Sequence, residues 1–125
     1  MSGISMVIID DVKSVIDGIL RKIDWAKHGI AVAGTAVNGK EGLRLIRERQ
    51  PDIVLTDIRM PMGSGIDMVR ELKEGGGFAA KVIFFSGYSD FAYAQESVRL
   101  GAFDYVLKPF TVRQIEDVVL RAKAR

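Results

Sequence analysis

Apolar residues follow two alternating patterns along this chain. Short unbroken apolar runs, such as 6–9 and 53–55, are typical of strands that are buried on both faces of a parallel sheet. Between the runs, apolar residues recur three and four positions apart, as on one face of an amphipathic helix. Five strand-then-helix units follow one another. Strict alternation of this kind predicts an α/β fold with a parallel sheet, helices on both faces and right-handed crossovers.

The expected elements can be placed by residue number. We expect strands at 6–9, 31–36, 53–57, 81–85 and 105–107, and the small residues of the second strand favour a sheet edge. Ser64 and Asp90 are the expected N-caps of the third and fourth helices. The residues expected to face inward from the five helices are Val12, Val15, Ile16, Ile19, Leu20 and Ile23; Leu43 and Ile46; Ile66, Val69 and Leu72; Phe91, Ala94 and Val98; and Val112, Ile115, Val118, Val119 and Ala122.

Length and composition place the chain among ordinary globular proteins. Its 125 residues suit a single domain, 1–125, and 48% of them are hydrophobic and 27% charged. The absence of cysteine excludes disulfides and cysteine zinc sites. No apolar run approaches the roughly 20 residues of a membrane span, and the amino terminus lacks signal-peptide features, so we expect a cytoplasmic protein without a membrane partner. The net charge of +2 is too small to argue for direct nucleic-acid binding.

Polar side chains stand at the ends of four expected strands. Asp10 and Asp11 follow the first strand, Asp57 ends the third, Ser86 follows the fourth and Lys108 follows the fifth. The carboxyl ends of parallel strands lie on one edge of the sheet, where open α/β sheets bind ligands. Taken singly, each residue also fits a helix cap, a turn or the surface. Their joint placement at four strand ends indicates a binding site.

The residue types at this edge favour a metal ion and a phosphoryl group. Three carboxylates repel one another unless a cation joins them. Oxygen ligands without His or Cys favour a hard ion, most simply Mg²⁺, held by Asp10, Asp11 and Asp57. Carboxylates also accept phosphoryl groups covalently, and Lys108 and Ser86 could bind the remaining oxygens of a phosphoryl group on Asp57. Such a site would act through positioning and charge neutralisation.

Four short motifs combine these residues with their neighbours. They are Ile9-Asp10-Asp11, Asp57-Ile58-Arg59-Met60-Pro61 with Gly65 four residues on, Ser86-Gly87, and Lys108-Pro109. Together they make nearly the whole chain similar to the receiver domains of bacterial two-component response regulators. The resemblance implies a flavodoxin-like, doubly wound sheet of five parallel strands in the order 2-1-3-4-5, with five helices.

The resemblance also implies a role for each site residue. Asp57 would be the phosphoacceptor, and Lys108 would contact the phosphoryl group after a cis Lys108-Pro109 peptide. Mg²⁺ would be bound directly by Asp11, Asp57 and the backbone carbonyl of Arg59, and by Asp10 largely through water. Ser86 would be the switch hydroxyl and Tyr105 the switch aromatic residue. Gly87 would leave room for the phosphoryl group.

A receiver domain of this kind would be a signalling switch. It would take its phosphoryl group from a sensor histidine kinase, and it would catalyse its own phosphorylation and dephosphorylation without being a multiple-turnover enzyme. The fourth helix, fifth strand and last helix would form the surface that changes and that pairs with a second copy. The candidate residues of that surface are Phe91, Tyr93, Arg99, Phe103 and Arg113.

A narrower resemblance concerns the protein to which such a domain is attached. Three stretches, Ile23-Asp24-Trp25, the nine residues 86–94, and Gly101-Ala102-Phe103-Asp104-Tyr105, are similar to receivers that precede AraC-type DNA-binding domains. This resemblance implies a regulator of transcription that reaches DNA only through an output domain absent from this chain.

Two positions depart from the usual receiver pattern. Val12 stands where a Glu often follows the acidic pair, which changes the outer electrostatics of the site. The stretch Met62-Gly63-Ser64 replaces the more usual Met-Asp before the glycine, so we expect a more mobile loop beside Asp57 and an altered phosphoryl lifetime.

Three other functions stay open at this point. Residues 34–41 nearly spell the phosphate loop G-x4-G-K-[ST], but Glu41 takes the place of the hydroxyl residue and would repel phosphate. An aspartyl-phosphate phosphatase of the haloacid-dehalogenase type would carry a second Asp two residues after the nucleophile, where this chain has Arg59. A degenerate receiver would act by protein contact alone, without phosphorylation.

Overall fold

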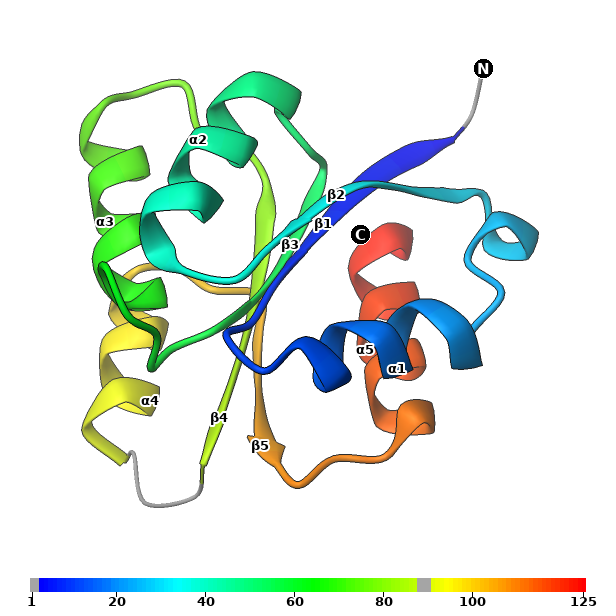
Figure 1. Cartoon of the computed structure of the whole chain (residues 1–125). Helices are drawn as coiled ribbons and strands as arrows, with labels where there is room; N and C mark the ends of the chain where they lie inside the picture. The colour runs from blue at the N-terminus through cyan, green and yellow to red at the C-terminus, as the bar shows by residue number, and fades with distance from the viewer. Residues whose placement is uncertain (1–2, 88–90) are drawn as a thin grey trace.

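The structure is a computed structural model that describes residues 3–87 and 91–125, and the side chain of Phe91 lies outside the described part. The described residues form one sheet and the helices around it (Figure 1). The strands are β1 (Ile4–Ile9), β2 (Ile30–Ala36), β3 (Ile53–Asp57), β4 (Lys81–Gly87) and β5 (Asp104–Lys108). The helices are α1 (Lys13–Lys22), the 3₁₀ turn η1 (Ala26–His28), α2 (Gly39–Arg49), α3 (Gly65–Glu74), α4 (Phe91–Arg99) and α5 (Val112–Ala124).

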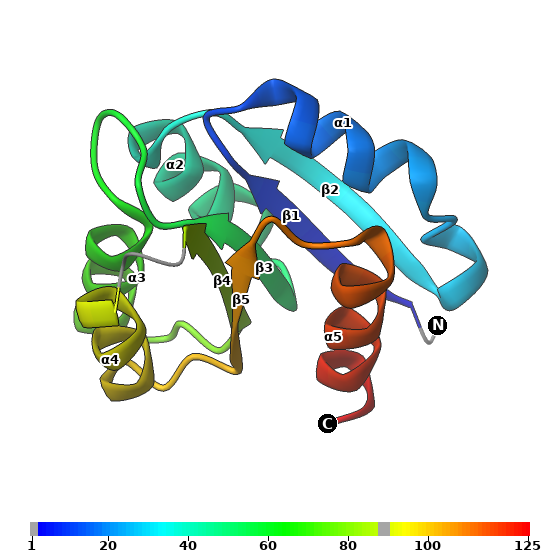
Figure 2. The same ribbon diagram turned by 90° about the horizontal axis from the view of Figure 1, so that it is seen from below.

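All neighbouring strands are parallel, and their order in the sheet is β2-β1-β3-β4-β5. This confirms the predicted fold class and strand order. The helices α1 and α5 cover one face of the sheet, and α2, α3 and α4 cover the other (Figure 1). Because all the strands are parallel, they end at the same edge of the sheet, onto which Figure 2 looks.

Alternation along the central strands supplies an apolar core on each side of the sheet. Met6 and Ile8 of β1 face α1 and α5, whereas Val7 and Ile9 face α2 and α3. All five residues of β3, Ile53–Asp57, are buried, as expected for a strand between two helical layers. The central strand thereby carries Asp57 to the exact point where the apolar interior ends.

Side-chain caps begin three of the helices. Asn38, Ser64 and Thr111 each accept a hydrogen bond from the backbone N–H three residues on, which satisfies a donor that the first helical turn leaves unpaired. The predicted cap at Ser64 is therefore confirmed. The predicted cap at Asp90 lies outside the described residues.

Three expected core positions are exposed, and these expectations were wrong. Val12 is the N-cap of α1 rather than a helical residue, and Leu20 lies at the margin of a buried stripe that Ile16 and Ile19 form. On α4, Val98 is 75% exposed and Ser97 is buried instead. Ser97 Oγ donates to the carbonyl oxygen of Ala94 at 2.7 Å, and because its hydroxyl is satisfied within the helix, a polar residue can occupy the inner face.

None of the helices in the described part of the chain combines the length and the apolar character that crossing a bilayer requires.

The same substitution on two helices tests this assignment of faces. Val118→Ala removes two buried methyl groups from α5 (1% exposed) and is expected to lower the free energy of unfolding by about 2 kcal/mol. Val98→Ala on α4 should change it by less than about 0.5 kcal/mol, because that side chain is exposed. Urea unfolding followed by circular dichroism measures both. Equal losses would show that the inner face of α4 is assigned wrongly.

Candidate acidic site at the carboxyl edge

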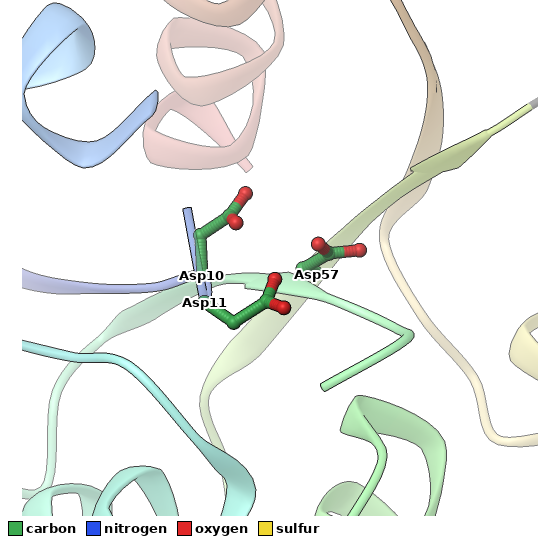
Figure 3. Close-up of side chains that lie close together, drawn as sticks. All are labelled: Asp10, Asp11 and Asp57. Carbon is green, nitrogen blue, oxygen red and sulfur yellow. The ribbon is translucent and has the colours of Figure 1, made fainter. Parts of the chain in front are cut away.

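Three aspartates meet where two neighbouring strands end. Asp10 and Asp11 follow β1, and Asp57 is the last residue of β3, which pairs with β1. One carboxylate oxygen from each lies within 4.8 Å of the others (Figure 3). Asp10 and Asp57 are buried, whereas Asp11 is exposed. The structure therefore brings together the acidic residues that the sequence predicts as one site.

Lys108 reaches this group from two strands away. It ends β5, where its partner across the ladder on β4 is Gly87, a residue without a side chain. The ammonium lies 5.3 Å from the centre of the Phe85 ring and 3.0 Å and 2.9 Å from carboxylate oxygens of Asp10 and Asp57. The Lys108-Pro109 peptide is cis, as the resemblance implied. One cation at the end of β5 thus bridges carboxylates at the ends of β1 and β3.

Burial and pairing both act on the pKa values of two members of this bridge, Asp10 and Lys108. Burial raises the pKa of Asp10, although hydrogen bonds from the Val12 amide and the Lys108 ammonium oppose the rise. For Lys108, burial works to lower the pKa, but hydrogen bonds to Asp57 and Asp10 outweigh it and the pKa is raised. Lys108 therefore stays positively charged in the site.

Hydrogen bonds from neighbouring residues hold both the carboxylate and the backbone of Asp57 in place. Its Oδ1 accepts a hydrogen bond from the Ile58 amide at 2.7 Å, and its Oδ2 accepts the one from Lys108. Thr56, which is fully buried, donates its hydroxyl to the Asp57 carbonyl at 2.9 Å. These contacts hold the carboxylate at the sheet edge with its side chain 7% exposed.

The loop after β3 packs tightly against both Asp57 and α2. A Cβ on Gly65 would lie 2.3 Å from the carbonyl oxygen of Asp57, and the Gly65 amide donates to Ile58 at 2.8 Å. In the middle of the loop, the carbonyl of Pro61 accepts a hydrogen bond of 3.2 Å from the amide of Gly39 on α2. Gly65 is thus needed where the chain passes closest to Asp57.

The other predicted residues lie around this core of the site. Ser86 is buried in β4, in register with Leu107 of β5. Tyr105 is half-buried on β5 and packs against the core on the α2–α3 side. Arg59 is exposed just beyond β3, and its guanidinium lies 6.0 Å from the centre of the Tyr93 ring on α4.

The candidate surface residues are only partly described. Tyr93 and Phe103 are half-buried, and Arg99 and Arg113 are exposed, while the side chain of Phe91 lies outside the described part of the chain.

The donor set fits a divalent cation. The three carboxylates outnumber the single ammonium by two charges when all groups are ionised. Their ligand atoms are oxygens alone, which suit Mg²⁺ better than a transition metal. The residues present therefore match the ion that the sequence predicts.

Two contributions were missed from the sequence. Phe85 lies beneath the Lys108 ammonium, and its place two residues before the end of β4, opposite Asp57 of β3, was the available signal. Thr56 supports the backbone of Asp57, and its place as a polar residue inside an apolar run could have drawn attention to it.

The near match to a phosphate loop is divided between two elements. Its first three residues belong to the edge strand β2, and its second glycine begins α2. Asn38 Oδ1 already accepts from the Glu41 amide at 2.8 Å, so a side chain takes that donor at the helix start.

Comparison with known proteins assigns the family. The family model described as the response regulator receiver domain matches residues 6–120. This chain belongs to that family. The fold and the acidic edge are therefore those of a receiver domain of two-component response regulators.

Relatives of this receiver domain include regulators of transcription. An uncharacterized response regulatory protein of Staphylococcus epidermidis is 36% identical over 114 residues, which are 91% of this chain and 44% of that protein. The transcriptional regulatory protein HptR of Staphylococcus aureus is 34% identical over 116 residues, 93% of this chain and 45% of HptR. The chain thus spans less than half the length of the curated relatives it matches.

Solved structures show the same fold. The receiver domain of AraT, a response regulator from Geobacillus stearothermophilus, has a TM-score of 0.88 and 31% identity, and covers 99% of this chain and 95% of its own. A response regulator receiver domain protein from Clostridium thermocellum has a TM-score of 0.81 and 31% identity, with 98% and 95% covered.

A pair of glycine substitutions tests the packing of the loop beside Asp57. Gly65→Ala is expected to lower the free energy of unfolding by about 1–3 kcal/mol, because the new Cβ would overlap the Asp57 carbonyl. Gly18→Ala on α1 should raise it by up to about 1 kcal/mol, since no atom lies within 4 Å of a Cβ there and alanine favours the helix. Thermal and urea unfolding measure both, and a Gly65→Ala chain as stable as the parent would contradict the close approach.

Proposed function

We propose that this receiver domain is a phosphorylation-dependent switch whose phosphoacceptor is Asp57. The observation that carries the proposal is the Lys108 ammonium, which lies 2.9 Å from Asp57 and 3.0 Å from Asp10 at the edge where the strands end. A carboxylate beside a fixed cation and further acidic ligands has the parts that phosphoryl transfer requires, namely positioning and charge neutralisation.

Each residue of the site has a proposed role. Asp11, Asp57 and the backbone carbonyl of Arg59 would ligate Mg²⁺, and Asp10 would act largely through water. The bound ion supplies positive charge for the phosphoryl oxygens. Lys108 supplies a second positive charge, and the Ile58 amide, 2.7 Å from Asp57 Oδ1, orients the attacking carboxylate. These assignments follow from the donor types and from membership of the family.

The proposed reaction is a transfer to a carboxylate oxygen. A carboxylate oxygen of Asp57 forms a bond to phosphorus while the phosphorus–nitrogen bond to the phosphohistidine of a sensor kinase breaks. The imidazole leaves with a proton from solvent. Hydrolysis of the acyl phosphate by water returns the carboxylate and inorganic phosphate. The domain therefore catalyses its own phosphorylation and dephosphorylation and does not process a further substrate.

The switch would connect this chemistry to the surface of α4, β5 and α5. Phosphorylation replaces the single negative charge of the Asp57 carboxylate with a phosphoryl group of about −1.5 to −2 charges. Ser86, on the strand between Asp57 and Lys108, would move towards the new phosphoryl oxygens. Tyr105, which is half-buried, would rotate into the space behind it. The altered α4–β5–α5 surface would then pair with a second copy, as a bistable element biased by local charge.

The partners proposed for the domain follow from its relatives. The chain covers less than half of HptR, a transcriptional regulatory protein, and its family serves two-component systems. We therefore place it in the cytoplasm, as the regulatory domain, residues 1–125, of a longer transcription regulator, with a sensor histidine kinase upstream. The quoted motifs around Trp25, Ser86 and Tyr105 favour an AraC-type DNA-binding output domain.

Intact-mass spectrometry with acetyl phosphate and Mg²⁺ tests the phosphoacceptor. The wild-type chain should gain one phosphoryl group, and Asp57→Asn or the addition of EDTA should abolish the gain. Asp104→Asn is the matched control, because Asp104 pairs with Arg121 at the far end of β5. This substitution should not affect the gain of the phosphoryl group. A wild-type chain that never gains the group would favour a receiver that acts by protein contact alone. Sustained hydrolysis of a phosphate ester would favour a phosphatase.

A second experiment tests the role of Ser86 as a switch. Ser86→Ala is expected to take up phosphate at Asp57 but to lose most of the change in the Tyr105 ring signals that phosphorylation causes in wild type, because the hydroxyl that moves is missing. Ser86→Thr retains a hydroxyl and should retain the change. Nuclear magnetic resonance (NMR) of tyrosine-labelled chains measures both, and an unchanged Tyr105 response in Ser86→Ala would refute the coupling.

A further inference from the structure

Few of the described side chains of helix α4 are buried. Among its described side chains, at residues 92–99, only Ser97 is buried. Val98 is 75% exposed, and Tyr93 is half-buried. Since burial of apolar area is the main source of helix anchoring, the polar contacts of α4 have more influence on its position than they would on a well-buried helix.

Two arginines from the chain after β3 contact one face of α4. The guanidinium of Arg59 lies 6.0 Å from the centre of the Tyr93 ring, within the range of a cation–π contact. The guanidinium of Arg70 on α3 donates to Glu96 at 3.0 Å and to Asp67 at 2.8 Å. Tyr93 and Glu96 are three residues apart, so both lie on the side of α4 that faces α3 and the loop after β3.

The Arg70 contact defines where α4 rests. Its guanidinium uses one nitrogen for α3 and another for α4, and the hydrogen bond to Glu96 raises the pKa of Arg70. The bridge therefore keeps α4 beside α3. Because this bridge fixes α4 at Glu96, a shift of Arg59 would act on the helix at Tyr93, which lies one turn nearer its start.

Arg59 connects two functions within one residue. It stands two positions after Asp57, and its backbone carbonyl is the proposed Mg²⁺ ligand. Its side chain extends to Tyr93 on another element. A backbone group that is drawn to a cation at the acidic site cannot move without moving the Cα to which the guanidinium is attached.

We propose that Arg59 couples Mg²⁺ binding at the acidic site to the position of α4 through its contact with Tyr93. The coupling acts before any phosphoryl transfer and does not involve Ser86 or Tyr105. It makes Arg59 a positioning residue, with its main chain at the ion and its side chain on the helix. This inference rests on the proposed metal site, and the experiment separates the two.

A titration of the 125-residue chain with Mg²⁺ alone, followed by NMR, tests the coupling. Two sets of backbone amide signals are compared. The site signals are those of Asp11 and Ile58, and the helix signals are those of Tyr93 and Glu96. In wild type, both sets should shift with the same Mg²⁺ dependence.

Variants at Arg59 and Tyr93 isolate the side-chain contact. Arg59→Met keeps the backbone carbonyl and an unbranched stem, and it should keep the site-signal shifts and lose most of the helix-signal shifts. Tyr93→Phe retains the ring face and should behave as wild type, whereas Tyr93→Leu should behave as Arg59→Met. Arg44→Met is the control, because Arg44 is an exposed arginine on α2. In this variant, both sets of signals should shift as they do in wild type.

Each other outcome of these titrations contradicts the coupling, and one of them also contradicts the metal site. The coupling is overturned, and the metal site is retained, if the helix signals still shift fully in Arg59→Met. The same conclusion holds if, in wild type, the site signals shift and the helix signals do not. Loss of both sets in Arg59→Met also overturns the coupling, because the side chain would then act at the ion. Site signals that never shift in wild type overturn the metal site and the coupling together.

Discussion

The Lys108 ammonium between Asp10 and Asp57 is the contact on which the arrangement of this edge depends. Lys108 is 98 positions from Asp10 and 51 positions from Asp57 along the chain, and the three residues stand at the ends of three different strands. Buried carboxylates cannot remain charged beside one another without a cation, so the bridge is what allows two of them to face the same space. Lys108 offsets only part of their charge. The remaining excess of negative charge suits a divalent cation, in keeping with the proposed Mg²⁺ site.

Parallel topology explains why such a contact can form at all. Every strand ends at one edge, and the order β2-β1-β3-β4-β5 places β3 beside β1 and β4 between β3 and β5. Lys108 must therefore cross β4 to reach Asp57, and it does so above Phe85 and beside Gly87, which has no side chain to obstruct it. Gly65 approaches the Asp57 backbone so closely that a Cβ there would overlap its carbonyl oxygen. The fold thus supplies the convergence, and small residues supply the room.

The strands and the site were predictable because each depends on a strong local pattern. The run that ends at Asp57 has the expected bounds, and polar residues at strand ends necessarily share an edge. The exposed faces of helices were less predictable. On α4, Val98 was expected to face inward but is exposed. Ser97 is buried instead, because its hydroxyl is satisfied inside the helix, which a hydropathy pattern does not register. Contacts between distant elements, such as Phe85 beneath Lys108, depend on side-chain direction across strands, which residue spacing alone does not determine.

The account is tested most directly by a crystal structure grown with Mg²⁺ and beryllium fluoride, a mimic of the phosphoryl group. We predict that the metal ion will be bound by the carboxylates of Asp11 and Asp57 and by the Arg59 carbonyl. The fluoride group should be attached to Asp57 and contacted by the Lys108 ammonium. An ion bound at another place, or Lys108 turned into solvent while Asp57 carries the fluoride group, would contradict the account.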